Sequence, residues 1–134
     1  MKPIKARITN ALNIGSEVNT CDNSGAKIVR IVAIIGRGKT VKSRNPAAGI
    51  ADLVRVSIRK GLPTMKGKVF YGVLVRQRKE FRRLSGERIK FADNSIAILK
   101  DEKGNPQGTL IKGPVAKEVA DRWPNVSKLA SVVV

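Results

Sequence analysis

The chain has 134 residues, a length that suits one domain with its own hydrophobic core. Lys and Arg number 27 against 10 Asp and Glu, and a net charge of +17 on a chain that is 42% hydrophobic indicates a folded protein with an anionic partner. There is no His and Cys21 is the only cysteine, which disfavours imidazole catalysis, zinc sites and disulfides and fits a reducing, cytoplasmic setting.

Residues 1–14 show little periodic pattern and are predicted to form an extended arm that carries Lys2, Lys5 and Arg7. The arm is expected to be either ordered by a partner or solvated. A strand is expected around Glu17–Cys21, and it leads into the sequence Asp22-Asn23-Ser24-Gly25. Short polar side chains followed by glycine are typical of a tight turn.

A β-branched run follows this turn, over Lys27–Ile35, and predicts a second strand. Two-residue alternation separates its side chains into two faces. One face is expected to hold Val29, Ile31, Ala33 and Ile35, and the other Ile28, Arg30, Val32 and Ile34. Because both faces are largely apolar, the strand is predicted to be central in its sheet.

The segment 36–49 is interpreted as a basic loop. Its first residues, Gly36-Arg37-Gly38-Lys39-Thr40, resemble part of a phosphate-binding P-loop. That motif needs a glycine where this chain has Ala33, and it needs a helix where this chain continues into a poor helix start before Pro46. A basic loop that touches RNA phosphates therefore explains these residues better than nucleotide hydrolysis.

The next strand is predicted over Leu53–Lys60, which alternates cleanly. Its inward residues are expected to be Val54, Val56 and Ile58, and its outward residues Arg55, Ser57 and Arg59. A second basic loop, Gly61–Gly67, connects this strand to the one that starts at Val69.

The stretch Val69–Leu99 is predicted to form one long hairpin with a basic tip. It begins as a strand that is apolar on both faces apart from Gly72, turns at Leu84–Glu87 and re-enters an apolar run at Ile96. Seven basic residues lie between Arg76 and Lys90, against two glutamates. Arginine predominates among them, which suits bidentate contact with phosphates, so we favour a binding role over a merely solvated charged face.

The C-terminal third is expected to differ from the rest. A turn is predicted at Asp101–Pro106, and a short helix is predicted to open at Gly113-Pro114 and to end at Trp123-Pro124. The chain closes with three apolar residues, Val132–Val134. Several short strands with Gly and Pro punctuation predict a small barrel.

These features favour nucleic acid as the anionic partner. No apolar run approaches the ~18 residues of a membrane span, so no membrane contact is expected. Aromatic residues are only 4% of the chain, so recognition of the backbone and shape of folded RNA is favoured over base stacking. An architectural DNA binder is the remaining alternative. Cys21 is interpreted as a small buried hydrophobe, and no catalytic residue, metal or cofactor is expected.

The residues in this order resemble the universal large-subunit ribosomal protein fourteen family, in its archaeal and eukaryotic style. The similar motifs, which run from about Val18 to the C-terminus, are Asp22–Ala26, Gly72–Val75, Ser85-Gly86, Ile89–Asn94, Gly108-Thr109 and Ile111–Glu118. Residues 1–14 resemble the extension that separates this style from the bacterial one. One departure is Ala51, where the family often has glycine.

The resemblance implies a single domain, 1–134, that is mainly β. Residues 15–111 would form a small closed five-stranded barrel with a protruding hairpin, and residues 112–134 a C-terminal segment of loops and short helix. It also implies a structural, non-enzymatic role in the large subunit, at the face that meets the small subunit. The implied partners are large-subunit rRNA, large-subunit proteins three and twenty-four, small-subunit rRNA at an intersubunit bridge, and an anti-association factor of the initiation factor six type.

Two sets of site residues follow from the basic pattern and the resemblance together. Contacts with rRNA are expected from Asn23, Ser24, Lys27, Arg37, Lys39, Lys42, Arg44, Arg59, Lys60, Lys66, Lys68, Arg76, Arg78, Lys79, Arg82, Arg83 and Arg88. Contacts with proteins are expected from Thr109, Lys112, Lys117 and Arg122.

Overall fold

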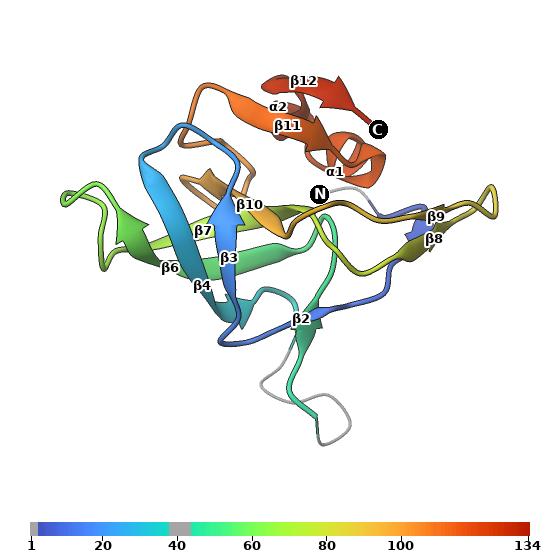
Figure 1. The fold of residues 1–134 in the computed structure, drawn as a ribbon, viewed down its shortest axis with the longest axis horizontal. Coiled ribbons are helices and arrows are strands. Elements are labelled where there is room, and N and C mark those ends of the chain that lie inside the picture. Colours follow the sequence, from blue (N-terminus) through green and yellow to red (C-terminus); the bar gives the residue numbers. More distant parts are fainter. Residues whose placement is uncertain (1–2, 38–43) are drawn as a thin grey trace.

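The computed structural model describes residues 3–37 and 44–134 and is built on a closed barrel (Figure 1). Its five strands follow one another around the barrel in the order β10-β3-β4-β6-β7. Neighbours are antiparallel except β10 and β3, whose parallel pairing closes the barrel. The strands are β3 (Glu17–Thr20), β4 (Ala26–Ile34), β6 (Leu53–Gly61), β7 (Val69–Arg76) and β10 (Ser95–Leu99). The predicted five-stranded barrel is therefore confirmed.

The barrel interior is filled by alternate residues of its strands. In β6, the predicted inward residues Val54, Val56 and Ile58 are at most 1% exposed, which confirms the alternation. In β4 the prediction fails partway: Ile34 was expected on the face opposite Val29, yet both are buried. The register of β4 on β6 shifts between Ile31 and Ala33, and such a bulge exchanges the two faces of the strand beyond it.

A second core lies outside the barrel, between β7, β10 and the C-terminal segment. Val73, Leu74 and Val75 of β7 are all fully buried, as expected for a strand that is apolar on both faces. Trp123 fills the centre of this outer core, and its indole N–H donates to the carbonyl of Ala51 at 2.9 Å. The C-terminal segment is thus packed on the barrel by burial of apolar surface.

The C-terminal segment consists of a short sheet and two short helices (Figure 1). The prediction of a helix opening at Gly113-Pro114 is wrong, since both residues belong to a strand that pairs in parallel with the last strand. The end of the first helix before Trp123-Pro124 is confirmed. The elements are β11 (Ile111–Val115), α1 (Lys117–Arg122), α2 (Pro124–Ser127) and β12 (Ala130–Val133).

Over its described residues, 3–14, the N-terminal arm is extended, as predicted, but it is ordered by the protein itself, and Lys2 lies outside the described residues. Strand β1 (Ala6–Arg7) pairs with the hairpin, and β2 (Leu12–Asn13) pairs with β5 (Ala47–Ala48) in the segment before β6. Ile4 and Ile8 pack against the outer core, and these two apolar contacts anchor the arm.

The predicted hairpin is present but is divided into two parts. Strands β7 and β10 form its base within the barrel, whereas β8 (Phe81–Arg83) and β9 (Arg88–Ile89) form a small outer sheet with β1. This outer sheet projects sideways from the barrel (Figure 1). The two parts are separated at Gln77, which is fully buried and donates its side-chain N–H groups to the carbonyls of Thr9 and Lys79.

Among the described residues, no helix is long and apolar enough to cross a membrane.

Candidate nucleic-acid interface

Most carboxylates of this chain are occupied by internal contacts. Asp22 accepts the N–H of Ile98 at 2.9 Å, Asp52 accepts the N–H of Gly49 at 2.8 Å, and Asp101 accepts the N–H of Lys103 at 3.0 Å. Burial raises the pKa of Asp22, the hydrogen bond from Ile98 opposing it. Because the acids support the fold, they leave the exposed cations largely without counter-charges.

The turn at Asp22–Gly25 is held together by its own side chains. The Asn23 carboxamide accepts the N–H of Thr109 at 2.8 Å and donates to the Thr109 hydroxyl at 2.9 Å. The Ser24 hydroxyl donates to Asp22 at 2.9 Å. Of the two predicted contact residues, Asn23 therefore links the turn to Thr109, and Ser24 stabilises the turn locally. Asn23 nevertheless remains exposed.

The two basic loops place most of their predicted cations at the surface. Two arginines have carboxylate partners: Arg37 lies 3.3 Å from Asp52 and Arg59 lies 3.7 Å from Glu17. Lys39 and Lys42 lie outside the described residues, as does part of the P-loop-like sequence. The exposed loop and strand-end cations are Lys27, Arg37, Arg44, Arg59, Lys60, Lys66 and Lys68.

Four of the predicted hairpin cations are exposed: Arg78, Lys79, Arg82 and Arg88. Arg88 is 63% exposed and lies 3.7 Å from Glu80, a surface pair that contributes little to stability. Their guanidinium and ammonium groups are available to phosphates.

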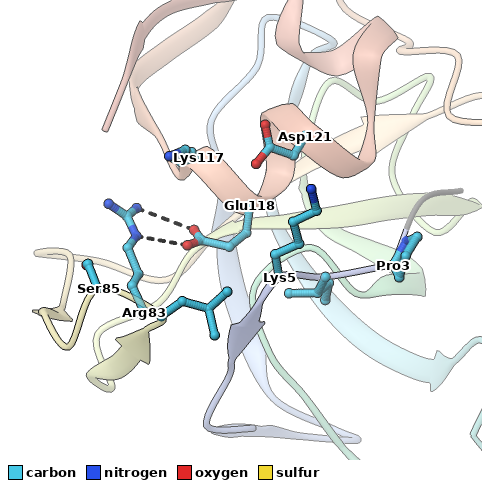
Figure 2. Close-up of a pocket in the computed structure, with 9 residues that line it drawn as sticks. Pro3, Lys5, Arg83, Ser85, Lys117, Glu118 and Asp121 are labelled. Atoms are coloured by element: carbon cyan, nitrogen blue, oxygen red, sulfur yellow. Dashed lines mark hydrogen bonds and ion pairs between the residues drawn. The ribbon is translucent and has the colours of Figure 1, made fainter.

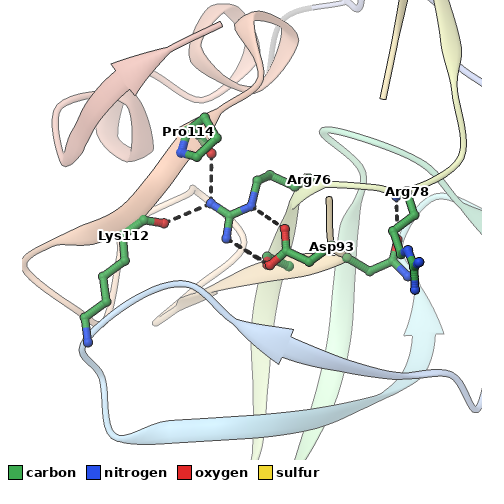
Figure 3. Close-up of polar contacts among 7 residues, drawn as sticks. Arg76, Arg78, Asp93, Lys112 and Pro114 are labelled. Atoms are coloured by element: carbon green, nitrogen blue, oxygen red, sulfur yellow. Dashed lines mark hydrogen bonds and ion pairs between the residues drawn. The ribbon is translucent and has the colours of Figure 1, made fainter. Parts of the chain in front are cut away.

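Arg76, also predicted as an RNA contact, does not belong to this exposed set. Its side chain is 9% exposed, and all five N–H donors of the guanidinium have acceptors within the protein (Figure 3). It donates to Asp93 at 2.9 and 3.2 Å, to the carbonyls of Lys112 and Pro114 at 2.8 and 2.9 Å, and to Ser95 at 3.0 Å. Arg76 thus connects the hairpin base to β11, and its hydrogen bonds hold the pKa of Asp93 below its usual range.

Arg83, a further predicted RNA contact, is likewise engaged in contacts within the protein. Its side chain donates to Glu118 of α1 at 2.8 and 3.4 Å and to the carbonyl of Val134 at 2.6 Å. The side chain of Arg83 is 15% exposed and that of Glu118 is 7% exposed. Figure 2 shows this pair at one side of a pocket that Lys5 and Asp121 also line.

The four predicted protein-contact residues differ in their environments. Thr109, Lys112 and Lys117 are exposed. Arg122 is only 16% exposed; it lies 3.6 Å from Asp52 and donates to the carbonyl of Ala51 at 3.3 Å. Arg122 therefore links α1 to the segment that precedes β6.

One exposed cation beside the predicted set was missed by the sequence reasoning. Arg7 of β1 lies directly opposite Arg82 of β8 in the outer sheet. The available signal was the alternation Ile4-Lys5-Ala6-Arg7-Ile8, which has the period of a strand.

The described residues offer little to a chemical reaction. Burial raises the pKa of the Cys21 thiol to about 12, the charge of Arg76 opposing it, so the prediction of a buried, inert cysteine fits. No group of three or more potential metal ligands occurs among residues 3–37 and 44–134. The arrangement is instead suited to contact with polyanions.

Comparisons with known proteins point to a single family. The chain matches the family model described as ribosomal protein L14p/L23e over residues 11–134. It is 54% identical to the large ribosomal subunit protein uL14 of Nanoarchaeum equitans, 46% to that of Methanocorpusculum labreanum and 43% to that of Methanothrix thermoacetophila. Each of these comparisons spans 134 residues and covers 100% of both chains.

Proposed function

Because the chain belongs to the family of ribosomal proteins L14p/L23e, which makes it a structural component of the large ribosomal subunit rather than an enzyme, we propose that it binds large-subunit rRNA through its basic loops and its hairpin. The observation that carries the proposal is the separation of charges. Most carboxylates are used in internal contacts, while the described loop cations and the hairpin cations Arg78, Lys79, Arg82 and Arg88 stay at the surface. Such a surface is stabilised by phosphates that replace the missing counter-charges.

The barrel would act as a rigid base for these contacts. The pairing of β6 with β7 fixes where the second basic loop, Gly61–Gly67, emerges, so its cations meet RNA with little loss of backbone entropy. Contacts with phosphates position a protein on folded RNA without reading its sequence. The low aromatic content, 4%, agrees with this mode.

The exposed C-terminal residues Thr109, Lys112 and Lys117 would meet other components at the face toward the small subunit. The partners proposed there are large-subunit proteins three and twenty-four, small-subunit rRNA at a bridge, and an anti-association factor. What supports this is a surface held rigidly on the barrel by Trp123 and by the Arg76 contacts to β11.

The rRNA proposal is tested by the salt dependence of binding. The full chain is titrated with its own large-subunit rRNA at several salt concentrations, and compared with the combined Arg78/Arg82/Arg88→Ala variant. Each phosphate contact that is lost should reduce the slope of log K against log salt by ~0.7–0.9, because fewer counterions are released.

The matched control is the combined Lys100/Lys103/Lys128→Ala variant. It removes three exposed charges as well, but from outside the proposed surface. Its slope should stay closer to that of the unmodified chain than the slope of the hairpin variant. Equal slopes for the two variants would refute the hairpin as an RNA contact.

A further inference from the structure

Three arginines form a row across the outer sheet. In this sheet the strand order is β1-β8-β9, so β8 is central. Arg82 of β8 lies opposite Arg7 of β1 on one side and opposite Arg88 of β9 on the other. Residues directly opposite in antiparallel strands project from the same face of a sheet, so the three side chains share one face.

The opposite face of the outer sheet is turned toward the protein. Phe81 is fully buried, and Ile89 is partly buried against the outer core. By contrast, Arg7, Arg82 and Arg88 are all exposed. The apolar residues therefore fix the sheet on the body and direct the arginine row toward solvent.

The row is electrostatically unfavourable in the free protein. Like charges directly opposite one another in a sheet are destabilising. Within the part of the chain that the structure describes, Glu80 beside Arg88 is the only carboxylate within ion-pair distance of the row. A hollow adjoins the other two arginines and is lined by Arg7, Arg82, Arg83 and Leu84. The geometry thus leaves a recess beside Arg7 and Arg82, neither of which has a carboxylate of the described chain within ion-pair distance, whereas Arg83 at the same recess is bonded to Glu118.

We propose that this arginine row binds phosphates of an RNA backbone, so that strand β1 of the N-terminal arm is part of the RNA interface. The inference rests on the proposed rRNA binding and adds a site to it. Guanidinium groups match the geometry of phosphate oxygens and hold them bidentately. The strand spacing of about 4.8 Å sets neighbouring arginines side by side, and a phosphate placed between two of them removes the repulsion.

The proposal is tested with two substitutions at one position. Arg7→Ala should lower the slope of log K against log salt for large-subunit rRNA by ~0.7–0.9, whereas Arg7→Lys, which keeps the charge, should keep the slope. Arg7→Glu should raise the stability of the free chain and lower its affinity for RNA. It places a carboxylate opposite Arg82, so the free chain should unfold at a higher temperature in low salt while its affinity for RNA falls.

The outcomes separate this inference from the broader one. A slope that is unchanged in Arg7→Ala, with a reduced slope in the Arg78/Arg82/Arg88→Ala variant, would overturn the role of β1 and leave rRNA binding by the hairpin intact. Unchanged slopes in both variants would overturn both proposals. If Arg7→Glu lowered the unfolding temperature as well as the affinity, Arg7 would be a residue that supports the fold, and the proposal would fail.

Discussion

The base of the hairpin and its outer sheet use arginine in opposite ways. At the base, Arg76 is surrounded by two main-chain carbonyls, a carboxylate and a hydroxyl, and every donor of its guanidinium is satisfied. In the outer sheet, Arg7 and Arg82 lie opposite one another at the surface. The same side chain is a structural link in one region and a free cation in the other. What decides between them is whether acceptors from distant segments converge on the position.

The two regions also differ in what their loss would cost. Removing a buried, fully bonded guanidinium leaves acceptors without partners, so the free energy of unfolding falls. Removing an exposed arginine leaves no buried acceptor without a partner, so stability should not fall, while the attraction for anions weakens. Substitutions along the hairpin should therefore divide into those that change stability and those that change RNA binding.

The largest expected effect on stability is that of Arg76→Ala. It leaves Asp93 and the carbonyls of Lys112 and Pro114 without their donor, and should lower the free energy of unfolding by roughly 3 kcal/mol. Urea denaturation measures this change. Arg78→Ala, two residues along and exposed, is the matched control and should change stability by less than about 0.5 kcal/mol. Similar losses in both variants would contradict the distinction between the regions.

The adjacent pair Arg82 and Arg83 sharpens the comparison within one strand. Arg83→Ala breaks the buried contact with Glu118 and should lower the free energy of unfolding by about 2 kcal/mol, with the RNA salt slope unchanged. Arg82→Ala should not lower stability, because it removes the central charge of the arginine row, and it should reduce that slope by ~0.7–0.9. Denaturation of both variants measures the change in stability, and RNA titration measures the change in salt slope. The same pair of changes in both variants would refute the assignment of Arg83 to the fold and of Arg82 to RNA binding.

The pH dependence of stability tests the Arg76–Asp93 contact. The hydrogen bond from Arg76 lowers the pKa of Asp93, so the stability it contributes is complete above the usual Asp pKa of about 3.9 and is lost as pH falls through the lowered value. Asp93→Asn should therefore be less stable at pH 7, by about 1 kcal/mol since the carboxyl is partly exposed.

This deficit should narrow as the pH falls below about 4, where the unmodified Asp93 becomes neutral as well. Denaturation curves of the two proteins over that range measure it. A deficit that stays constant with pH would show that the ionised carboxylate contributes no extra stability.

The smallest expected effect lies at the contact between the barrel and the C-terminal segment. Ala51 has a φ of 69°, the left-handed region in which glycine is unstrained. Ala51→Gly should relieve about 1 kcal/mol of backbone strain. Two effects oppose this gain: the loss of a fully buried methyl group, which contributes about 0.8 kcal/mol, and the higher conformational entropy that glycine gives to the unfolded chain. These effects nearly cancel, so thermal unfolding should change by only a few degrees. A large shift in either direction would show that one of them dominates.

Much of the fold could be predicted from local pattern. The alternation of β6, the two apolar faces of β7 and the turn at Asp22–Gly25 each follow from side chains close together in the sequence. The charge imbalance indicated an anionic partner in the same direct way. The start of the C-terminal helix could not be predicted, because Gly113-Pro114 is held in a strand by β12 and by Arg76, which are distant along the chain.

By itself, the sequence determined a barrel with a surplus of positive charge and a basic hairpin, since periodicity and composition are properties of neighbouring residues. Only the tertiary structure decided which of the arginines are bound inside and which remain free. Arg76, Arg82 and Arg83 look alike in the sequence, and they differ only in whether distant acceptors reach them. The pairing of Arg7 with Arg82 is of the same kind, because it depends on how the arm folds back onto the hairpin.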